Sequence, residues 1–207
     1  MIKAIINDFA ENCYILYENH EAYIIDPGSN YCDMKAFLEK EDLTLKAVLL
    51  THGHYDHIGG LNDLLDDFDA PIYVHALERD FLFDPNLNLS TYMADRFKVS
   101  SKHKVHTFDE QDTFLLNNEP IKVVHTPGHT RGSVSFSYKN YLFTGDCLFR
   151  ETIGRTDLPT GNEETLINTV TDLTKTFDMN TLVYPGHGHF TTIAHESTFN
   201  PYIKSAK

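Results

Sequence analysis

The sequence is poor in cysteine, tryptophan and basic residues, and it has no long hydrophobic run. It contains three cysteines, no tryptophan, and 17 lysines and arginines against 30 aspartates and glutamates. Three scattered cysteines without a CxxC pair argue against a disulfide framework and a cysteine-based zinc site. No apolar stretch approaches a membrane span, and the start MIKAIINDFA lacks the pattern of a signal peptide. We therefore expect a cytoplasmic protein that does not interact with membranes.

Charge and composition indicate a small-molecule substrate. The net charge of −13 and the absence of a lysine or arginine cluster disfavour nucleic acid as a partner. With 207 residues, 41% of them hydrophobic, the chain is long enough to bury a substantial core. Histidine is unusually frequent, with 12 residues. The functional hypothesis therefore depends on where these histidines lie.

Strands and helices alternate along the chain without a linker rich in proline, glycine or serine. We therefore predict one α/β domain, residues 1–207, with two similar halves, about 1–104 and 105–207. Residues 76–104 have no clear pattern and are expected to be irregular. Apolar and β-branched runs predict strands at 2–8, 12–18, 22–28, 45–52, 71–75, 121–128, 133–140, 141–146 and 181–188, and helices are predicted at 33–42, 60–68, 162–177 and 191–198.

Polar clusters follow the ends of several predicted strands, where loops on a rigid sheet commonly form sites. THGHYDH follows the apolar run AVLL, and HTPGHT, TGDC and YPGHG follow other apolar runs. The candidate metal ligands are His52, His54, Asp56, His57, His129, Asp146 and His187. Five imidazoles and two carboxylates are too many for one tetrahedral ion but suit two divalent ions. Zinc is the first expectation, with iron or manganese as alternatives.

The ordered motifs THGHYDH, PGHT, TGD and YPGHG resemble those of the metallo-β-lactamase fold superfamily. Within it, GDCLFRETIGRTDLPTG at 145–161 and GHGHFTTIAHESTFNP near the C-terminus resemble the small glyoxalase II-like, or hydroxyacylglutathione hydrolase-like, branch. The resemblance implies an α/β fold of the αββα sandwich type, in which two mixed sheets are flanked by helices. It also implies a dinuclear metal centre and hydrolysis of S-(2-hydroxyacyl) thioesters.

The same resemblance divides the ligands between the two ions. His52, His54 and His129 would bind the first ion. Asp56, His57 and His187 would bind the second, and Asp146 would bridge the two. A metal-bridging hydroxide would attack the acyl carbonyl, and Asp56 would also orient this nucleophile as a catalytic residue. The leaving thiolate needs no dedicated general acid, because thiols have a pKa of about 8.5.

The chain departs from glyoxalase II proper, which has an additional C-terminal helical domain whose basic residues help to bind glutathione. This sequence ends about 20 residues after His187, so the resemblance does not specify the thiol. Arg155, in IGRTD, is the candidate substrate-binding residue, and the alternative is an ion pair with Asp157. Asp26, in IIDPG, either hydrogen-bonds the loop below the site or caps a turn, and we favour a structural role.

Four other functions are open at this stage. The first is a persulfide dioxygenase of the same fold with one iron, which His52, His129 and Asp146 would bind. A phosphodiesterase or nuclease is disfavoured by the negative charge. A β-lactamase is disfavoured because the chain is not expected to be exported. A metal-binding module without activity is disfavoured because glycine-lined loops leave room for a substrate. Neither the metal in the cell nor the oligomeric state follows from the sequence.

Overall fold

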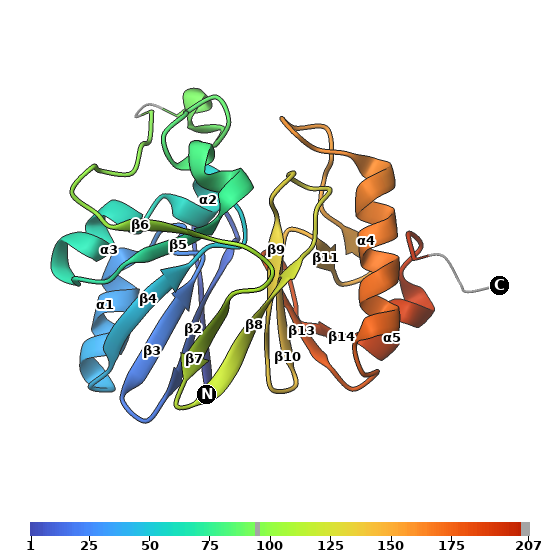
Figure 1. Ribbon diagram of the computed structural model, residues 1–207, viewed down its shortest axis with the longest axis horizontal. Helices are drawn as coiled ribbons and strands as arrows, with labels where there is room; N and C mark the ends of the chain where they lie inside the picture. The colour runs from blue at the N-terminus through green and yellow to red at the C-terminus, as the bar shows by residue number, and fades with distance from the viewer. Residues whose placement is uncertain (94–95, 204–207) are drawn as a thin grey trace. The chain divides into compact units, whose positions relative to one another are not determined.

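The structure is a computed structural model that describes residues 1–93 and 96–203. The chain divides into two compact units. The first contains Met1–Asp109 and Leu115–Glu119, and the second contains Glu110–Phe114 and the chain from Pro120 onward. Each unit has a mixed sheet with helices packed against it (Figure 1). Val105–Phe108 forms the last strand of the first sheet, so the first unit extends to Asp109.

The first sheet has six strands in the order β1-β2-β3-β4-β5-β6. β1, β2 and β3 are antiparallel neighbours, whereas β3 to β6 are parallel. Parallel neighbours require crossover connections, and these connections contain the helices and loops of this unit. The strands are β1 (Ile2–Ile6), β2 (Asn12–Glu18), β3 (Glu21–Ile25), β4 (Thr44–Leu49), β5 (Ile72–His75) and β6 (Val105–Phe108).

The helices of the first unit pack on its sheet through one apolar core. Ile24 and Val48 of the sheet share this core with Leu38 of α1 and Leu64 of α3, and all four side chains are buried. β4 is buried almost throughout its second half, as the continuous apolar run at 45–52 predicts. The helices are α1 (Tyr31–Lys40), α2 (Tyr55–Ile58) and α3 (Leu61–Asp67), with 3₁₀ helices at Ala76–Leu82 and Ser90–Tyr92.

The second sheet has the order β14-β13-β10-β9-β8-β7. β10 and β13 are parallel, whereas β8, β9 and β10 are antiparallel neighbours. A separate hairpin consists of β11 (Leu148–Phe149) and β12 (Thr152–Ile153). The sheet strands are β7 (Thr113–Leu116), β8 (Glu119–His125), β9 (Val134–Tyr138), β10 (Tyr141–Gly145), β13 (Leu182–Pro185) and β14 (Thr191–Thr192).

Two helices pack in this unit, α4 (Glu163–Thr176) and α5 (Ile193–Phe199). α4 begins at its N-cap Asn162, whose side-chain oxygen accepts a hydrogen bond from the Thr165 amide at 2.8 Å. Leu166, Val170 and Leu173 of α4 belong to one core with Leu142 and Val183 of the sheet. The predicted helix at 162–177 is therefore confirmed.

The structure differs from the sequence prediction mainly in short elements. α2 lies where a loop is predicted, and the two-residue strands β11 and β12 are not predicted at all. The predicted strands 22–28, 45–52 and 181–188 end earlier, at Ile25, Leu49 and Pro185. Each ends at or close to its polar motif, most of whose residues lie outside the sheet.

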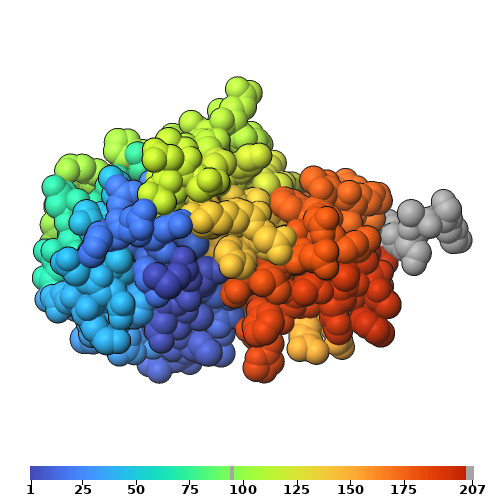
Figure 2. All heavy atoms as spheres, turned by 90° about the horizontal axis from the view of Figure 1, so that it is seen from below, coloured from blue at the N-terminus to red at the C-terminus, as the bar shows by residue number. Residues whose placement is uncertain are grey.

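The N-terminal strand β1 is an edge strand of the first sheet, with Met1 and Ile6 exposed. Figure 2 shows this start of the chain, in dark blue, at the surface. Over the residues that the structure describes, no helix combines the length and apolar character needed to cross a membrane.

Candidate metal centre

The first unit contributes four of the predicted ligands, which we call the first donor group: His52, His54, Asp56 and His57. They follow the end of β4, and His54 is the N-cap of the short helix α2. The ring centroid of His52 lies 4.7 Å from that of His54 and 4.2 Å from that of His57. All three imidazoles are buried, whereas the Asp56 side chain is partly exposed. The loop therefore collects three imidazoles within one small region, as the motif predicts.

Asp26 fixes the start of this loop and the ring of His57 through hydrogen bonds. It follows β3, and its carboxylate accepts hydrogen bonds from the Thr51 amide at 2.8 Å and the Thr51 hydroxyl at 2.6 Å. Its Oδ2 also lies 3.0 Å from His57 Nδ1. A proton on Nδ1 that is donated to Asp26 leaves the lone pair of His57 on Nε2, which is how carboxylates orient metal-binding imidazoles. Of the two interpretations of Asp26, the structure shows the hydrogen bond to the loop below the site.

The loop of the first donor group is also fixed by the region 76–104. The Gly53 amide donates to Oε2 of Glu78 at 3.1 Å, and the Tyr55 amide donates to the Asn88 carbonyl at 2.8 Å. Both partners are fully buried. No sequence pattern indicates a role for Glu78, because the region around it has no periodicity that would place it beside the metal motif.

The second unit contributes His129, Asp146 and His187, which we call the second donor group. Asp146 and His187 follow the neighbouring parallel strands β10 and β13, whose last residues Gly145 and Pro185 are paired. Carboxyl ends of parallel strands meet at one edge of a sheet. Oδ2 of Asp146 lies 3.6 Å from Nε2 of His129 and 3.6 Å from Nε2 of His187. One carboxylate therefore faces two imidazoles, as a bridging ligand would.

His129 is oriented by the main chain of its own unit. Its Nδ1 lies 2.7 Å from the carbonyl oxygen of Arg155, a distance at which a proton on Nδ1 is donated to that oxygen. The Nε2 atom, which faces Asp146, then carries the lone pair. His187 is positioned differently, with its ring edge-on to Phe149 at a centroid distance of 6.0 Å.

The donor atoms and the buried charges fit divalent cations. Among the described residues no lysine or arginine is buried, whereas Glu11, Asp26 and Glu78 of the first unit are. Buried carboxylates need a balancing positive charge, and a metal ion supplies one. Cys147, next to Asp146, is fully buried, and burial raises the pKa of its thiol to about 12. The predicted donors are imidazole and carboxylate, which suit zinc, iron or manganese.

Arg155 forms an ion pair with Asp157. Its Nε and Nη2 each donate to a different oxygen of Asp157 at 2.7 Å, and the guanidinium lowers the pKa of this carboxyl to about 2. Both side chains remain well exposed, at 63% and 68%. The pairing that the sequence left open as the alternative is therefore present in the structure. Substrate binding by Arg155 stays a prediction.

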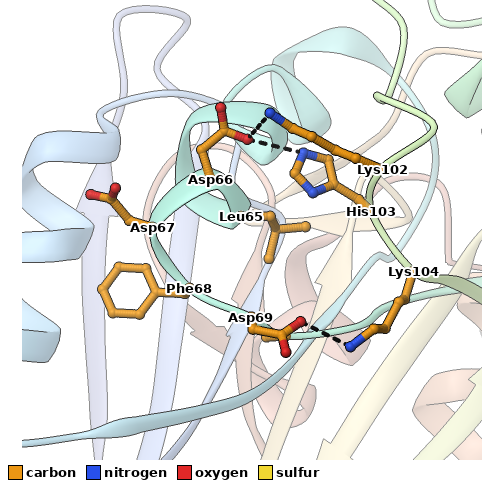
Figure 3. A pocket seen from close by; sticks show the side chains of 9 residues that line it. Leu65, Asp66, Asp67, Phe68, Asp69, Lys102, His103 and Lys104 are labelled. Carbon is orange, nitrogen blue, oxygen red and sulfur yellow. Dashed lines mark hydrogen bonds and ion pairs between the residues drawn. The ribbon is translucent and has the colours of Figure 1, made fainter.

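A pocket of about 420 Å³ in the first unit contains none of the predicted ligands (Figure 3). Two ion pairs form between side chains that line it. Lys102 Nζ lies 2.6 Å from Asp66, and Lys104 Nζ lies 2.9 Å from Asp69. The third carboxylate of the lining, Asp67, pairs with Lys35, which lies outside the pocket. Because each carboxylate already has a basic partner, the described residues that line the pocket offer no unpaired lysine for an anionic ligand.

His103 in this pocket is expected to make stability depend on pH. Its side chain is nearly buried, and burial lowers its pKa below the usual 6.5, although Asp66 acts in the opposite direction. The unfolded chain then binds more protons, so this contribution is present above the usual pKa and is lost as the pH falls through it. We expect His103→Asn to lose less stability than the wild type between about pH 7.5 and 5.5, as measured by urea unfolding. Equal losses would contradict this role for His103.

Comparison with known proteins identifies the family. The profile of the metallo-beta-lactamase superfamily matches residues 6–191. The chain belongs to this superfamily. A probable metallo-hydrolase of Streptococcus pyogenes is 41% identical over 206 residues, covering 97% of this chain and 89% of its own. The hydroxyacylglutathione hydrolase GloC of Haemophilus influenzae is 33% identical, covering 97% and 96%. This metallo-β-lactamase superfamily member is therefore a metallo-hydrolase with relatives in the branch that its motifs resemble.

Solved structures of the same superfamily share the fold. BLEG-1, a B3 metallo-beta-lactamase, is 38% identical, with a TM-score of 0.91 over 99% of this chain and 100% of its own. TTHA1623 in a di-iron-bound form is 29% identical, with a TM-score of 0.83 over 98% and 100%. The predicted fold class, two mixed sheets flanked by helices, is confirmed. The fold implies a divalent metal, and the histidines are placed to bind it.

Proposed function

We propose that the two donor groups together bind two divalent metal ions. His52, His54 and His129 would bind the first ion, and Asp56, His57 and His187 would bind the second. Asp146 would bridge the ions. The observation that supports this most is that Oδ2 of Asp146 faces Nε2 of both His129 and His187. Zinc is the proposed metal, with iron or manganese as alternatives.

We further propose that the protein is a thioester hydrolase of the glyoxalase II type. When bound, the ions would supply hydroxide near neutral pH and an electrophile for the acyl oxygen. Asp56, partly exposed beside the buried imidazoles, would orient the attacking oxygen. A thiolate, whose conjugate acid has a pKa of about 8.5, leaves without a general acid. The similarity to GloC of H. influenzae supports this substrate class.

We expect the enzyme to act in the cytoplasm on a free small-molecule thioester. Its net charge of −13 disfavours nucleic acid as a partner. Arg155 is the proposed contact to the thiol part of the substrate, once the substrate competes with Asp157 for the guanidinium.

The test is thiol release from S-lactoylglutathione by the purified protein. We expect turnover that a chelator abolishes and that zinc, iron or manganese restores. The matched control is the chelated protein without added metal, measured on the same preparation. Absence of thiol release with every metal would contradict the proposal for this substrate class.

The same protein preparation is also assayed for two other reactions, each with its own substrate. Hydrolysis of a β-lactam is included because BLEG-1, which is 38% identical, is a metallo-beta-lactamase. Persulfide oxidation is included as the alternative that the sequence motifs leave open, with a single iron bound by His52, His129 and Asp146. One metal ion per chain and oxygen consumption with a persulfide would favour that alternative over the hydrolase.

A further inference from the structure

Glu11 is a buried carboxylate beside the first donor group, and no function has been assigned to it so far. It follows the turn between β1 and β2 and is fully buried. Its Oε1 lies 4.0 Å from Nδ1 of His57, the same atom that Asp26 approaches to 3.0 Å. His57 therefore has two carboxylates on the side opposite its Nε2 atom.

A second connection runs from Glu11 through Asn7 to the main chain of Asp56. Asn7 Nδ2 donates to Glu11 Oε2 at 2.7 Å and to the Asp56 carbonyl at 3.2 Å. The Asn7 Oδ1 atom accepts hydrogen bonds from the amides of Phe9 at 2.9 Å and Glu11 at 3.0 Å. One buried asparagine thus joins the β1–β2 turn to the helix that presents Asp56 and His57.

The negative charges of Glu11 and Asp26 both act on the nearby thiol of Cys13. The pKa of the buried Cys13 thiol is raised well above its usual value, first by burial and then by the negative charges of Glu11 and Asp26. None of the buried residues in the described part of the chain is a lysine or arginine. The positive charge that balances two carboxylates at one imidazole is therefore expected on the other side of that imidazole.

We propose that Glu11 is a positioning residue of the metal centre, whose negative charge, together with that of Asp26, strengthens the binding of the ion at His57. This inference rests on the proposed pair of ions, but it is tested on metal binding rather than on turnover. Carboxylates behind a metal-binding imidazole orient the ring and increase its basicity. Charge is the deciding property, because a glutamine at position 11 keeps the hydrogen bond to Asn7.

The experiment uses the full chain, stripped of metal and titrated with Zn²⁺ against a chromogenic chelator. We expect the wild type to bind two equivalents. In Glu11→Gln the second equivalent should bind about 10- to 100-fold more weakly, while the first is unchanged. Glu11→Asp, which retains the charge, should stay close to the wild type.

Unfolding temperatures separate this role from a purely structural one. Glu11→Gln removes a charge that repels Asp26, so we expect the metal-free protein to be no less stable than the wild type. Only the rise in Tm on adding zinc should shrink. The matched control is Glu196→Gln, another fully buried glutamate, which accepts hydrogen bonds from Thr191, Asn200 and the Glu151 amide. None of these partners is a predicted ligand, so this control should lose stability and keep both zinc sites.

The outcomes distinguish a failure of the proposed metal centre from a failure of the proposed role of Glu11. A wild type that binds no zinc would overturn the metal centre and the role of Glu11 together. Two equally tight equivalents in both the wild type and Glu11→Gln would overturn the role of Glu11 alone. If Glu11→Gln does not fold, Glu11→Asp decides. If Glu11→Asp binds its second zinc equivalent tightly, the charge role is supported. A tenfold loss of that affinity would overturn it, because aspartate keeps the charge and loses only the side-chain length needed to reach Asn7.

Discussion

Replacing Asp146 with alanine is expected to abolish metal binding and thioester hydrolysis while the protein stays folded. In the second unit its Oδ2 atom lies 3.6 Å from Nε2 of both His129 and His187, so this carboxylate faces two of the predicted ligands. Loss of an outer partner of a ligand costs about 10- to 100-fold in metal affinity or activity, and loss of a bridging ligand should exceed that. Metal content by atomic emission and thiol release measure the two effects.

A surface aspartate of the same unit provides the control. Asp172 lies on α4, is 74% exposed and pairs with Lys175. Asp172→Ala should retain wild-type metal content and turnover, because an exposed pair within one helix contributes only about 0.3–0.5 kcal/mol. A folded Asp146→Ala protein with full metal content and normal turnover would show that the bridging assignment is wrong.

The fold could be predicted from the sequence, and the candidate ligands could be located in it, because both signals are local. Each metal motif directly follows an apolar strand, and THGHYDH contributes four of the candidates within a few residues. The apolar face of α4 likewise has helical spacing that is visible in the sequence. Local patterns of this kind do not depend on knowing which distant segments meet.

The partners that fix the ligands could not be predicted in the same way. Asn7 contacts Asp56 across 49 positions, and Glu78 contacts Gly53 across 25. Such contacts depend on strand pairing and on irregular loops, which leave no periodic trace in the sequence. Asp26 is an intermediate case, since its place after a strand suggested a role below the site but not its bond to His57. Short strands such as β11 are missed for a similar reason, because two residues show no alternation.

Replacing Gly28 with alanine is expected to be among the most damaging changes outside the ligands themselves. A Cβ at this position would lie 1.6 Å from the carbonyl oxygen of Asp56 and 2.5 Å from Asn7 Nδ2. The nearest obstacle is main chain, so α2 or the loop after β3 must move. Overpacking commonly costs about 1–3 kcal/mol and occasionally more, and we expect this site at the upper end. Urea unfolding should show that loss, and the metal content should fall because Asp56 and His57 lie on the displaced helix.

Gly188 provides the comparison, because alanine there tests backbone strain without a collision. Nothing lies within 4 Å of a Cβ at Gly188, but its φ of +77° is a conformation that alanine disfavours. Gly188→Ala should therefore lower the free energy of unfolding by about 1–2 kcal/mol, the usual penalty for a left-handed residue. Like Gly28, this glycine lies close to predicted ligands, since it adjoins His187. If Gly28→Ala were no more destabilising than Gly188→Ala, the close approach of the loop after β3 to Asp56 would not be what fixes the position of α2. The hydrogen bonds from Asn7 to the Asp56 carbonyl and between Asp26 and His57 would then fix the position of α2 without it.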